Sequence, residues 1–167
     1  RQLPADHNPR AVAWARSLRA SPELAQADPG QLAEALLAHV RTTGFGYTLT
    51  PGTYGIDAVD EFWLDRRVGF CEHYAASFVV LMRAMGVPAR IVTGYQGAEP
   101  PDADGWRIVR QSHAHAWAEY WEPRTGWVRV DPTAAVAPER IDLGAALRLR
   151  GGFVANTLVN MNPALAE

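Results

Sequence analysis

Three side chains of this sequence have the types needed to attack a carbonyl carbon. Cys71 is the single cysteine of the chain, and His115 and Asp131 follow it in the order nucleophile, base and carboxylate. A thiolate can attack a carbonyl, an imidazole can carry the proton, and a carboxylate can hold the imidazole in one orientation. These types indicate nucleophilic catalysis, provided that the fold brings the three side chains together.

The position of Cys71 favours a reactive thiol. It comes two residues after Gly69, at the start of a predicted helix from about Cys71 to Met85, and Gly86 ends this helix. The first turn of a helix leaves N–H groups unpaired and carries a partial positive charge. Both features favour a thiolate and supply donors for an oxyanion. A lone cysteine can also be a small buried apolar residue, so the assignment depends on whether a base reaches the sulfur.

His115 and Asp131 are predicted to lie on neighbouring antiparallel strands. If residues 122–126 form the turn, Asp131 pairs with Trp117, and His115 is its diagonal neighbour on the same face. A slip of two residues would instead place His115 directly opposite Asp131. Either register leaves the Cβ atoms about 5 to 8 Å apart, which is close enough for a hydrogen bond between imidazole and carboxylate.

The same residues permit a metal site as an alternative, with Cys71, His73, His113 and His115 as four ligands. Positions i and i+2 of a helix diverge by about 200°, so Cys71 and His73 cannot converge on one ion if both are helical. The acidic turn at residues 102–105 lacks the remaining ligands of an EF-hand. We therefore expect no metal and no other cofactor.

The elements that position these residues indicate an α+β fold. Helices are expected first, and a strand or an ordered loop is expected at Phe45–Gly55. After the helix that begins at Cys71, the apolar period changes from that of a helix to that of a strand. The other predicted helices are Pro9–Leu18, Gln31–Thr42 and Asp57–Arg67. The predicted strands are Ala89–Gln96, Trp106–Gln111, Ser112–Trp121 and Gly126–Asp131. Helices followed by an antiparallel meander define the α+β class.

Length and composition predict one globular domain over residues 1–167. We expect a core at 45–135, an N-terminal helical part at 1–44 and a helical C-terminal tail at 141–161. One cysteine excludes an internal disulfide framework, and a net charge of −2 argues against a nucleic-acid binder. The apolar runs are too short for a membrane span. The chain begins at Arg1 without a signal peptide, so we expect an excised or processed part of a longer protein.

Motifs around the three residues resemble those of the transglutaminase-like superfamily. The resemblance is strongest from about Asp57 to Thr133, and it is greatest to the bacterial membrane-anchored transglutaminases of the TgpA kind. The matching segments are Gly69–Ala75 (GFCEHYA), Gly86–Arg90 (GVPAR), His115–Glu119 (HAWAE) and Trp127–Thr133 (WVRVDPT). The order of cysteine, histidine and aspartate is also that of the family.

The resemblance implies a papain-like α+β fold and a protein-glutamine acyltransferase. Cys71 would be the nucleophile, His115 the general base and acid, and Asp131 the residue that orients His115. The substrates would be a protein or peptide glutamine donor and an amine acceptor, with a thioester between the two steps. The resemblance also implies a location at the periplasmic face of the bacterial inner membrane, with the anchor outside this sequence.

Two alternatives remain open at this point. The same triad serves cysteine proteases and amidases, and a binding domain can keep the fold without catalysis. The second oxyanion donor is also open, with Tyr47, Tyr54 and Trp63 as candidates by aromatic type and sequence position. Three tryptophans could line a cleft or belong to the core: Trp117, Trp121 and Trp127. All 16 basic residues are arginines, so the chain offers no lysine amine of its own as an acceptor.

Overall fold

The computed structural model describes residues 2–137, and the tail expected at 141–161 lies outside them. Two helices come first, α1 at Pro9–Arg19 and α2 at Pro29–Thr42. Both confirm the sequence expectation, with α2 starting two residues earlier. Asp28 caps α2, because its side chain accepts from the Gln31 backbone N–H and the Gln31 side chain accepts from that of Asp28. Such a reciprocal cap satisfies two donors that the first turn leaves unpaired.

Two carboxylates from a later segment fasten the start of α1. Asp60 is buried and accepts from the backbone N–H groups of Arg10 and Ala11 at 3.0 and 2.7 Å. Asp57 accepts from the N–H of Asn8 at 2.7 Å. An acid at this end of a helix pairs with free N–H groups and with the positive end of the helix dipole. The first helix is thereby tied to the segment that leads to Cys71.

The segment before Cys71 is a short, wide helix followed by a strand. It contains α3 at Ala58–Asp60 and a π-helix, η1, at Glu61–Arg66, which together confirm the short helix expected there. Strand β2 at Val68–Gly69 pairs in parallel with β1 at Gly46–Tyr47. The region expected as a strand or loop at 45–55 therefore contains a two-residue strand and a loop. This small pairing fixes the backbone immediately before Cys71.

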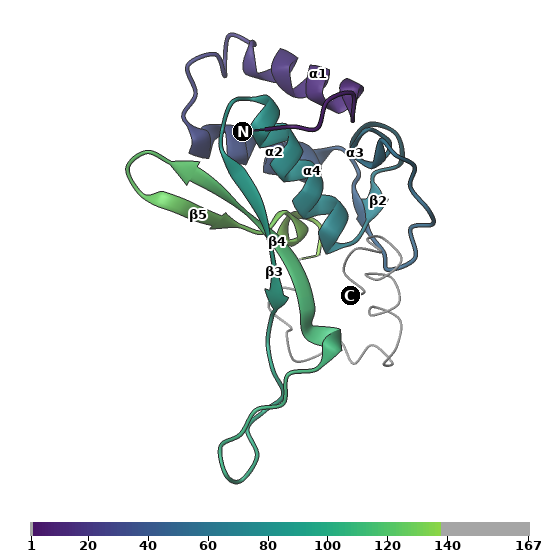
Figure 1. Cartoon of the computed structure of the whole chain (residues 1–167), viewed down its shortest axis with the longest axis vertical. Coiled ribbons are helices and arrows are strands. Elements are labelled where there is room, and N and C mark those ends of the chain that lie inside the picture. The colour runs from purple at the N-terminus through teal and green to yellow at the C-terminus, as the bar shows by residue number, and fades with distance from the viewer. Residues whose placement is uncertain (1, 138–167) are drawn as a thin grey trace.

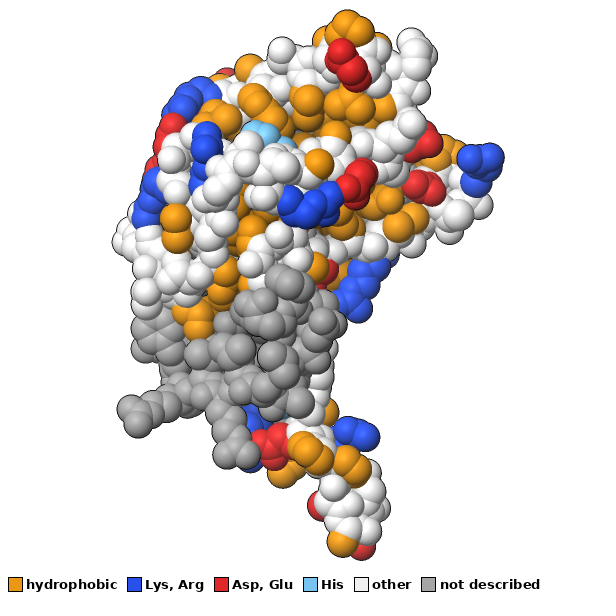
Figure 2. All heavy atoms as spheres, turned by 180° about the vertical axis from the view of Figure 1, so that it is seen from behind, with side chains coloured by type: hydrophobic (Ala, Val, Ile, Leu, Met, Phe, Trp, Pro, Cys, Tyr) orange, Lys and Arg blue, Asp and Glu red, His pale blue; other side chains and the backbone are white. Residues whose placement is uncertain are grey.

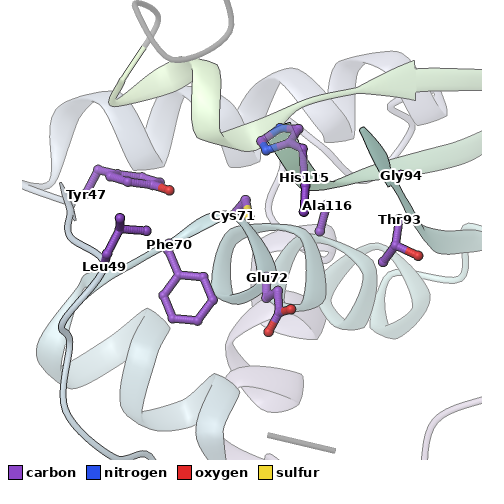
Figure 3. Close-up of a pocket in the computed structure, with 10 residues that line it drawn as sticks. Tyr47, Leu49, Phe70, Cys71, Glu72, Thr93, Gly94, His115 and Ala116 are labelled. Atoms are coloured by element: carbon purple, nitrogen blue, oxygen red, sulfur yellow. The ribbon is translucent and has the colours of Figure 1, made fainter. Parts of the chain in front are cut away.

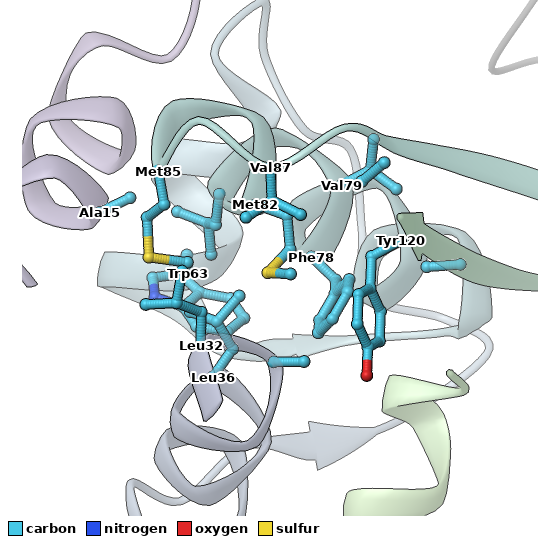
Figure 4. Close-up of a cluster of buried hydrophobic side chains, with 14 of the residues drawn as sticks. Ala15, Leu32, Leu36, Trp63, Phe78, Val79, Met82, Met85, Val87 and Tyr120 are labelled. Atoms are coloured by element: carbon cyan, nitrogen blue, oxygen red, sulfur yellow. The ribbon is translucent and has the colours of Figure 1, made fainter. Parts of the chain in front are cut away.

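Helix α4 runs from Cys71 to Ala84 and packs on one face of a three-stranded antiparallel sheet (Figure 1). The strands are β3 at Ala89–Tyr95, β4 at Ala114–Glu122 and β5 at Gly126–Val130, in the order β3-β4-β5. Figure 4 shows the core that joins α4 to its neighbours. Its side chains come from α2, α4 and the sheet and include Leu32, Leu36, Phe78, Met82 and Tyr120.

The register of the β4–β5 hairpin confirms the first of the two expected pairings. Trp121 pairs with Trp127 and Ala118 with Val130. Continuing this register places Asp131 opposite Trp117, so that His115 is its diagonal neighbour. The alternative with a two-residue slip is wrong.

The strand expected at Trp106–Gln111 is wrong. Residues 96–110 form an irregular arm that projects from the body of the protein (Figure 1). Scattered backbone bonds, such as Glu99 N–H to the Ile108 carbonyl, and an ion pair between Glu99 and Arg110 join its two sides. Trp106 is 76% exposed and Ile108 is 54% exposed, and Figure 2 shows hydrophobic surface beside acidic and arginine side chains on the arm. Among residues 2–137, no second layer covers the arm, so its alternating apolar residues are exposed there.

The next strand also begins later than expected. A single 3-10 turn, η2 at Gln111–His113, occupies the place predicted for the start of the strand at Ser112. Strand β4 therefore begins at Ala114, immediately before His115.

Candidate active site

Cys71 is the first residue of α4, as its sequence position predicted. Phe70 precedes it in an extended conformation, and the Cys71 thiol is free and partly exposed. Gly69 has no room for a side chain, because a Cβ there would lie 2.8 Å from the Phe62 ring and 2.9 Å from His73 Cβ. Gly69 therefore allows the backbone to lie close to Phe62 and His73, so that Cys71 begins the first turn of α4.

His73 supports this turn from the side facing the protein interior. Its side chain is buried, and its Nδ1 accepts from the Phe70 backbone N–H at 3.4 Å. The rings of Tyr54, Phe62 and Phe70 surround the imidazole at centroid distances of 4.5 to 5.7 Å. Burial, together with the charge of Arg66, lowers the pKa of His73 to about 4. His73 is therefore a neutral helix cap, a role that sequence reasoning missed, although its place at the third position of the helix is a usual capping position.

His115 and Asp131 form a close pair at the end of the sheet where β4 begins and β5 ends. His115 Nε2 lies 2.6 Å from Asp131 Oδ2, and both side chains are about nine-tenths buried. The second oxygen of Asp131 accepts from the Thr133 backbone N–H at 3.1 Å, at the start of the 3-10 turn η3, Pro132–Ala135. This second bond fixes the carboxylate, so the ring that it contacts is fixed as well.

The charge state of His115 follows from these contacts. Burial alone would lower its pKa, but the hydrogen bond to Asp131 and the interaction with Cys71 outweigh burial and raise the pKa of His115 to about 9. The imidazole is therefore protonated at neutral pH. A charged imidazolium beside a thiol favours the thiolate form of the sulfur.

Cys71 and His115 line one open pocket (Figure 3). In that view the Cys71 side chain points from the start of α4 toward the His115 ring on β4. Because Nε2 of His115 contacts the Asp131 carboxylate, Nδ1 is the ring nitrogen that can face the Cys71 sulfur. The other lining residues are Tyr47, Leu49, Phe70, Glu72, Thr93, Gly94, Ala114 and Ala116. The structure thus brings together the three residues chosen from the sequence.

The structure separates the three candidates for a second oxyanion donor. Trp63 is buried in the core, stacked on His39, and the Tyr54 hydroxyl donates to the Val68 carbonyl. Tyr47 lines the pocket, and Figure 3 shows its hydroxyl directed toward Cys71. Tyr47 is the candidate with access to the reacting atoms.

The three tryptophans proposed for the cleft lie beside the pocket or away from it. None of them is among its described lining residues. Trp117 stacks near His115, with ring centroids 6.3 Å apart, and the Arg129 guanidinium lies over its indole ring. Trp121 and Trp127 pair with each other at the far end of the hairpin, each 40% exposed.

The residues of the alternative metal site serve other roles. His113 Nδ1 accepts from the Arg110 backbone N–H, as His73 does from Phe70. Within residues 2–137, no three histidine, cysteine or acidic side chains come together in a way that could hold a metal ion. In the acidic turn, Asp102 accepts from the backbone N–H groups of Asp104 and Trp106.

Comparison with known proteins gives the family. The sequence profile of the transglutaminase-like superfamily matches residues 14–132. This chain belongs to that superfamily. It is 49% identical over 150 residues to a protein-glutamine gamma-glutamyltransferase of Pseudomonas aeruginosa, covering 90% of this chain and 22% of that protein.

Two crystal structures of the periplasmic domain of TgpA from Pseudomonas aeruginosa have the same fold. One, bound to ethylmercury, is 51% identical with a TM-score of 0.78 over 84% of this chain and 49% of that one. The other is 50% identical, with the same TM-score, over 86% and 48%. The chain thus spans about a fifth of the curated relative and about half of the solved domain. The predicted papain-like α+β fold is confirmed.

The similar solved structures are periplasmic domains. Among the described residues, no helix combines the length and apolar character that crossing a bilayer requires.

Proposed function

We propose that this chain catalyses transglutaminase-type acyl transfer, with Cys71 as the nucleophile. The observation that carries the proposal is the arrangement of three side chains from α4, β4 and the end of β5. Cys71 and His115 line the same pocket, and Asp131 Oδ2 lies 2.6 Å from His115 Nε2. Membership of the family and similarity to a protein-glutamine gamma-glutamyltransferase support a glutamine side chain as the substrate.

The reaction begins with the thiolate of Cys71 and the imidazolium of His115. The sulfur attacks the γ-carboxamide carbon of glutamine, and a tetrahedral oxyanion forms. His115 gives its proton to the departing nitrogen, so that ammonia leaves and a thioester remains. A primary amine then attacks the thioester, loses a proton to His115 and forms a new amide. Water in place of the amine gives glutamate.

Asp131 acts through His115 and does not touch the substrate. Its carboxylate fixes the ring and stabilises the positive charge that the ring carries before and after each transfer. The raised pKa of His115, about 9, is the expected result of this pairing.

The oxyanion requires two donors near the sulfur. The backbone N–H of Cys71 is one, since it belongs to the first turn of α4 and has no partner within the helix. We assign the second to the Tyr47 hydroxyl, which lines the same pocket. Loss of one such donor typically costs about 3 to 4 kcal/mol of transition-state stabilisation, so Tyr47→Phe should slow ammonia release by about 100-fold or more.

The proposed partners are a protein or peptide glutamine donor and a primary amine acceptor. The periplasmic origin of the similar structures supports the same location for this chain. We propose that the complete protein is anchored in the inner membrane by segments outside this sequence.

Amine incorporation tests the proposed function. The chain is incubated with a glutamine-bearing protein and a labelled primary amine, and both ammonia release and label incorporation are measured. Both are expected for the natural chain, and both should be lost in Cys71→Ala and Cys71→Ser, with little change in melting temperature. Peptide cleavage without ammonia release would identify a protease. Amine incorporation that survives in Cys71→Ala would contradict the assigned nucleophile, and a folded chain without any activity would identify a binding domain.

A further inference from the structure

Glu72 places a carboxylate in the wall of the pocket, next to the proposed nucleophile. It follows Cys71 in the first turn of α4 and lines the pocket that contains Cys71 and His115. It is the single acidic side chain among the described lining residues. Figure 3 shows its carboxylate on the opposite side of Cys71 from the His115 ring. The pocket therefore carries a positive group, His115, on one side and a negative group on the other.

The Glu72 carboxylate forms no ion pair with a described residue of the chain. Within residues 2–137, no arginine or histidine forms an ion pair with it, and no side chain or backbone group donates a hydrogen bond to it. Burial raises the pKa of Glu72, because the charged form loses hydration in this position. The partial charge at the start of α4 offsets only a part of that loss. A cation bound in the pocket would compensate the Glu72 carboxylate for its lost hydration by forming an ion pair with it.

The acceptor of the proposed reaction is such a cation. Primary amines, including the lysine side chain, are protonated at neutral pH, and the thioester is uncharged. Resting on the proposed function, we propose that Glu72 recognises the acyl acceptor as a cationic primary amine and thereby favours transfer to an amine over hydrolysis. The glutamine donor, being neutral, gains nothing from this charge.

The proton balance of the second step fits this role. The bound ammonium transfers one proton to the Glu72 carboxylate or to water, and the resulting neutral amine attacks the thioester carbonyl. The new C–N bond forms as His115 takes a second proton, and the C–S bond then breaks. The products are the substituted amide and the thiolate–imidazolium pair with which the cycle began, and the proton first taken by Glu72 passes to solvent.

The negative charge of Glu72 has opposite effects on the cationic acceptor and on the Cys71 thiolate, so the two effects can be distinguished. A negative carboxylate beside Cys71 disfavours the thiolate, so its removal should aid the sulfur. A loss of amine transfer in Glu72→Gln cannot then arise from a weaker nucleophile. Glu34→Gln is the matched control, because Glu34 is an exposed carboxylate on α2 that pairs with Arg41 and its substitution changes the net charge equally.

The test compares two acceptors with one glutamine donor. One is a labelled pentylamine, which is cationic near neutral pH, and the other is hydroxylamine, which is uncharged there. Glu72→Gln should raise KM for the pentylamine about tenfold, the effect of roughly one partly shielded ion pair, and leave KM for hydroxylamine within about twofold. The fraction of thioester lost to water should rise with the pentylamine. Glu34→Gln should match the natural chain in every measurement.

Equal effects of Glu72→Gln on both acceptors, or no effect on either, would overturn the assignment of Glu72. In both cases ammonia release by the natural chain shows that the proposed acyl transfer stands. Absence of ammonia release from the natural chain is a different result, because it rejects the proposed function itself and with it the role of Glu72.

Discussion

Two buried histidines on either side of Cys71 meet opposite electrostatic conditions. His73, under the first turn of α4, is enclosed by aromatic rings, and its pKa is lowered to about 4. His115, at the start of β4, faces the Asp131 carboxylate, and its pKa is raised to about 9. Both side chains are largely removed from water. Burial alone therefore does not decide the charge of an imidazole; the decisive difference is a carboxylate at hydrogen-bond distance.

The two regions divide the work around the sulfur. The His73 region is neutral and holds the backbone of Phe70, which sets the position of Cys71. The His115 region is charged, and in the proposed reaction it supplies the proton carrier. Changes at His73 should therefore affect mainly stability. Changes at Asp131, the partner of His115, should affect mainly catalysis.

Removal of the charge on Asp131 is expected to have the largest effect. In Asp131→Asn, the pKa of His115 should fall, and the ring loses the partner that fixes its orientation. Ammonia release should drop by about 10³- to 10⁴-fold, as in other triads that lose this charge. Asp65→Asn is the control, because Asp65 is an exposed carboxylate that pairs with Arg10. An Asp131→Asn variant that retains a tenth or more of the activity would refute the role of the carboxylate.

Changes at His73 should have a smaller effect, seen first in stability. His73→Leu removes the acceptor for the Phe70 N–H, and an unpaired buried donor costs about 1 kcal/mol or more. His73→Asn keeps an oxygen near the position of Nδ1, so it should recover a part of that loss. Urea denaturation measures both variants. The capping role is contradicted if Leu and Asn give equal stability.

The pH dependence of stability should show both histidines. The pKa of His73 is lowered from 6.5 to about 4, so its contribution is complete above pH 6.5 and is lost as the pH falls toward 4. The pKa of His115 is raised from 6.5 to about 9. Its contribution is therefore complete below pH 6.5 and is lost as the pH rises toward 9.

Thermal melts across this pH range measure the two limbs separately. His73→Asn should weaken the acid limb alone, and Asp131→Asn should weaken the alkaline limb alone. A variant that alters the other limb as strongly as its own would show that the two regions are not independent.

The parts of the site that were predicted correctly depend on short-range patterns. The start of α4 at Cys71 follows from a glycine before an apolar helical stripe. The pairing that brings His115 to Asp131 follows from the length of one hairpin turn, since one turn fixes every pair beyond it. These local rules brought Cys71, His115 and Asp131 together without knowledge of the whole fold.

The parts that were not predicted depend on contacts between distant segments. Asp60 caps α1 across about 50 residues of sequence, and no local pattern reveals such a partner. The residues from Trp106 have the alternation of a strand, but they lie on an arm that no other described part of the chain covers. His73 and Glu72 stand next to each other in the motif, and only the three-dimensional arrangement assigns one to the interior and the other to the pocket.

Alkylation of Cys71 by iodoacetamide as a function of pH tests the central claim most directly, because Cys71 is the single thiol of the chain. We expect a rate that is high and nearly constant through neutral pH, and a much lower rate at neutral pH in His115→Ala. A rate that climbs through about pH 8.5, as for an ordinary free thiol, and that His115→Ala leaves unchanged would contradict the proposed thiolate–imidazolium pair.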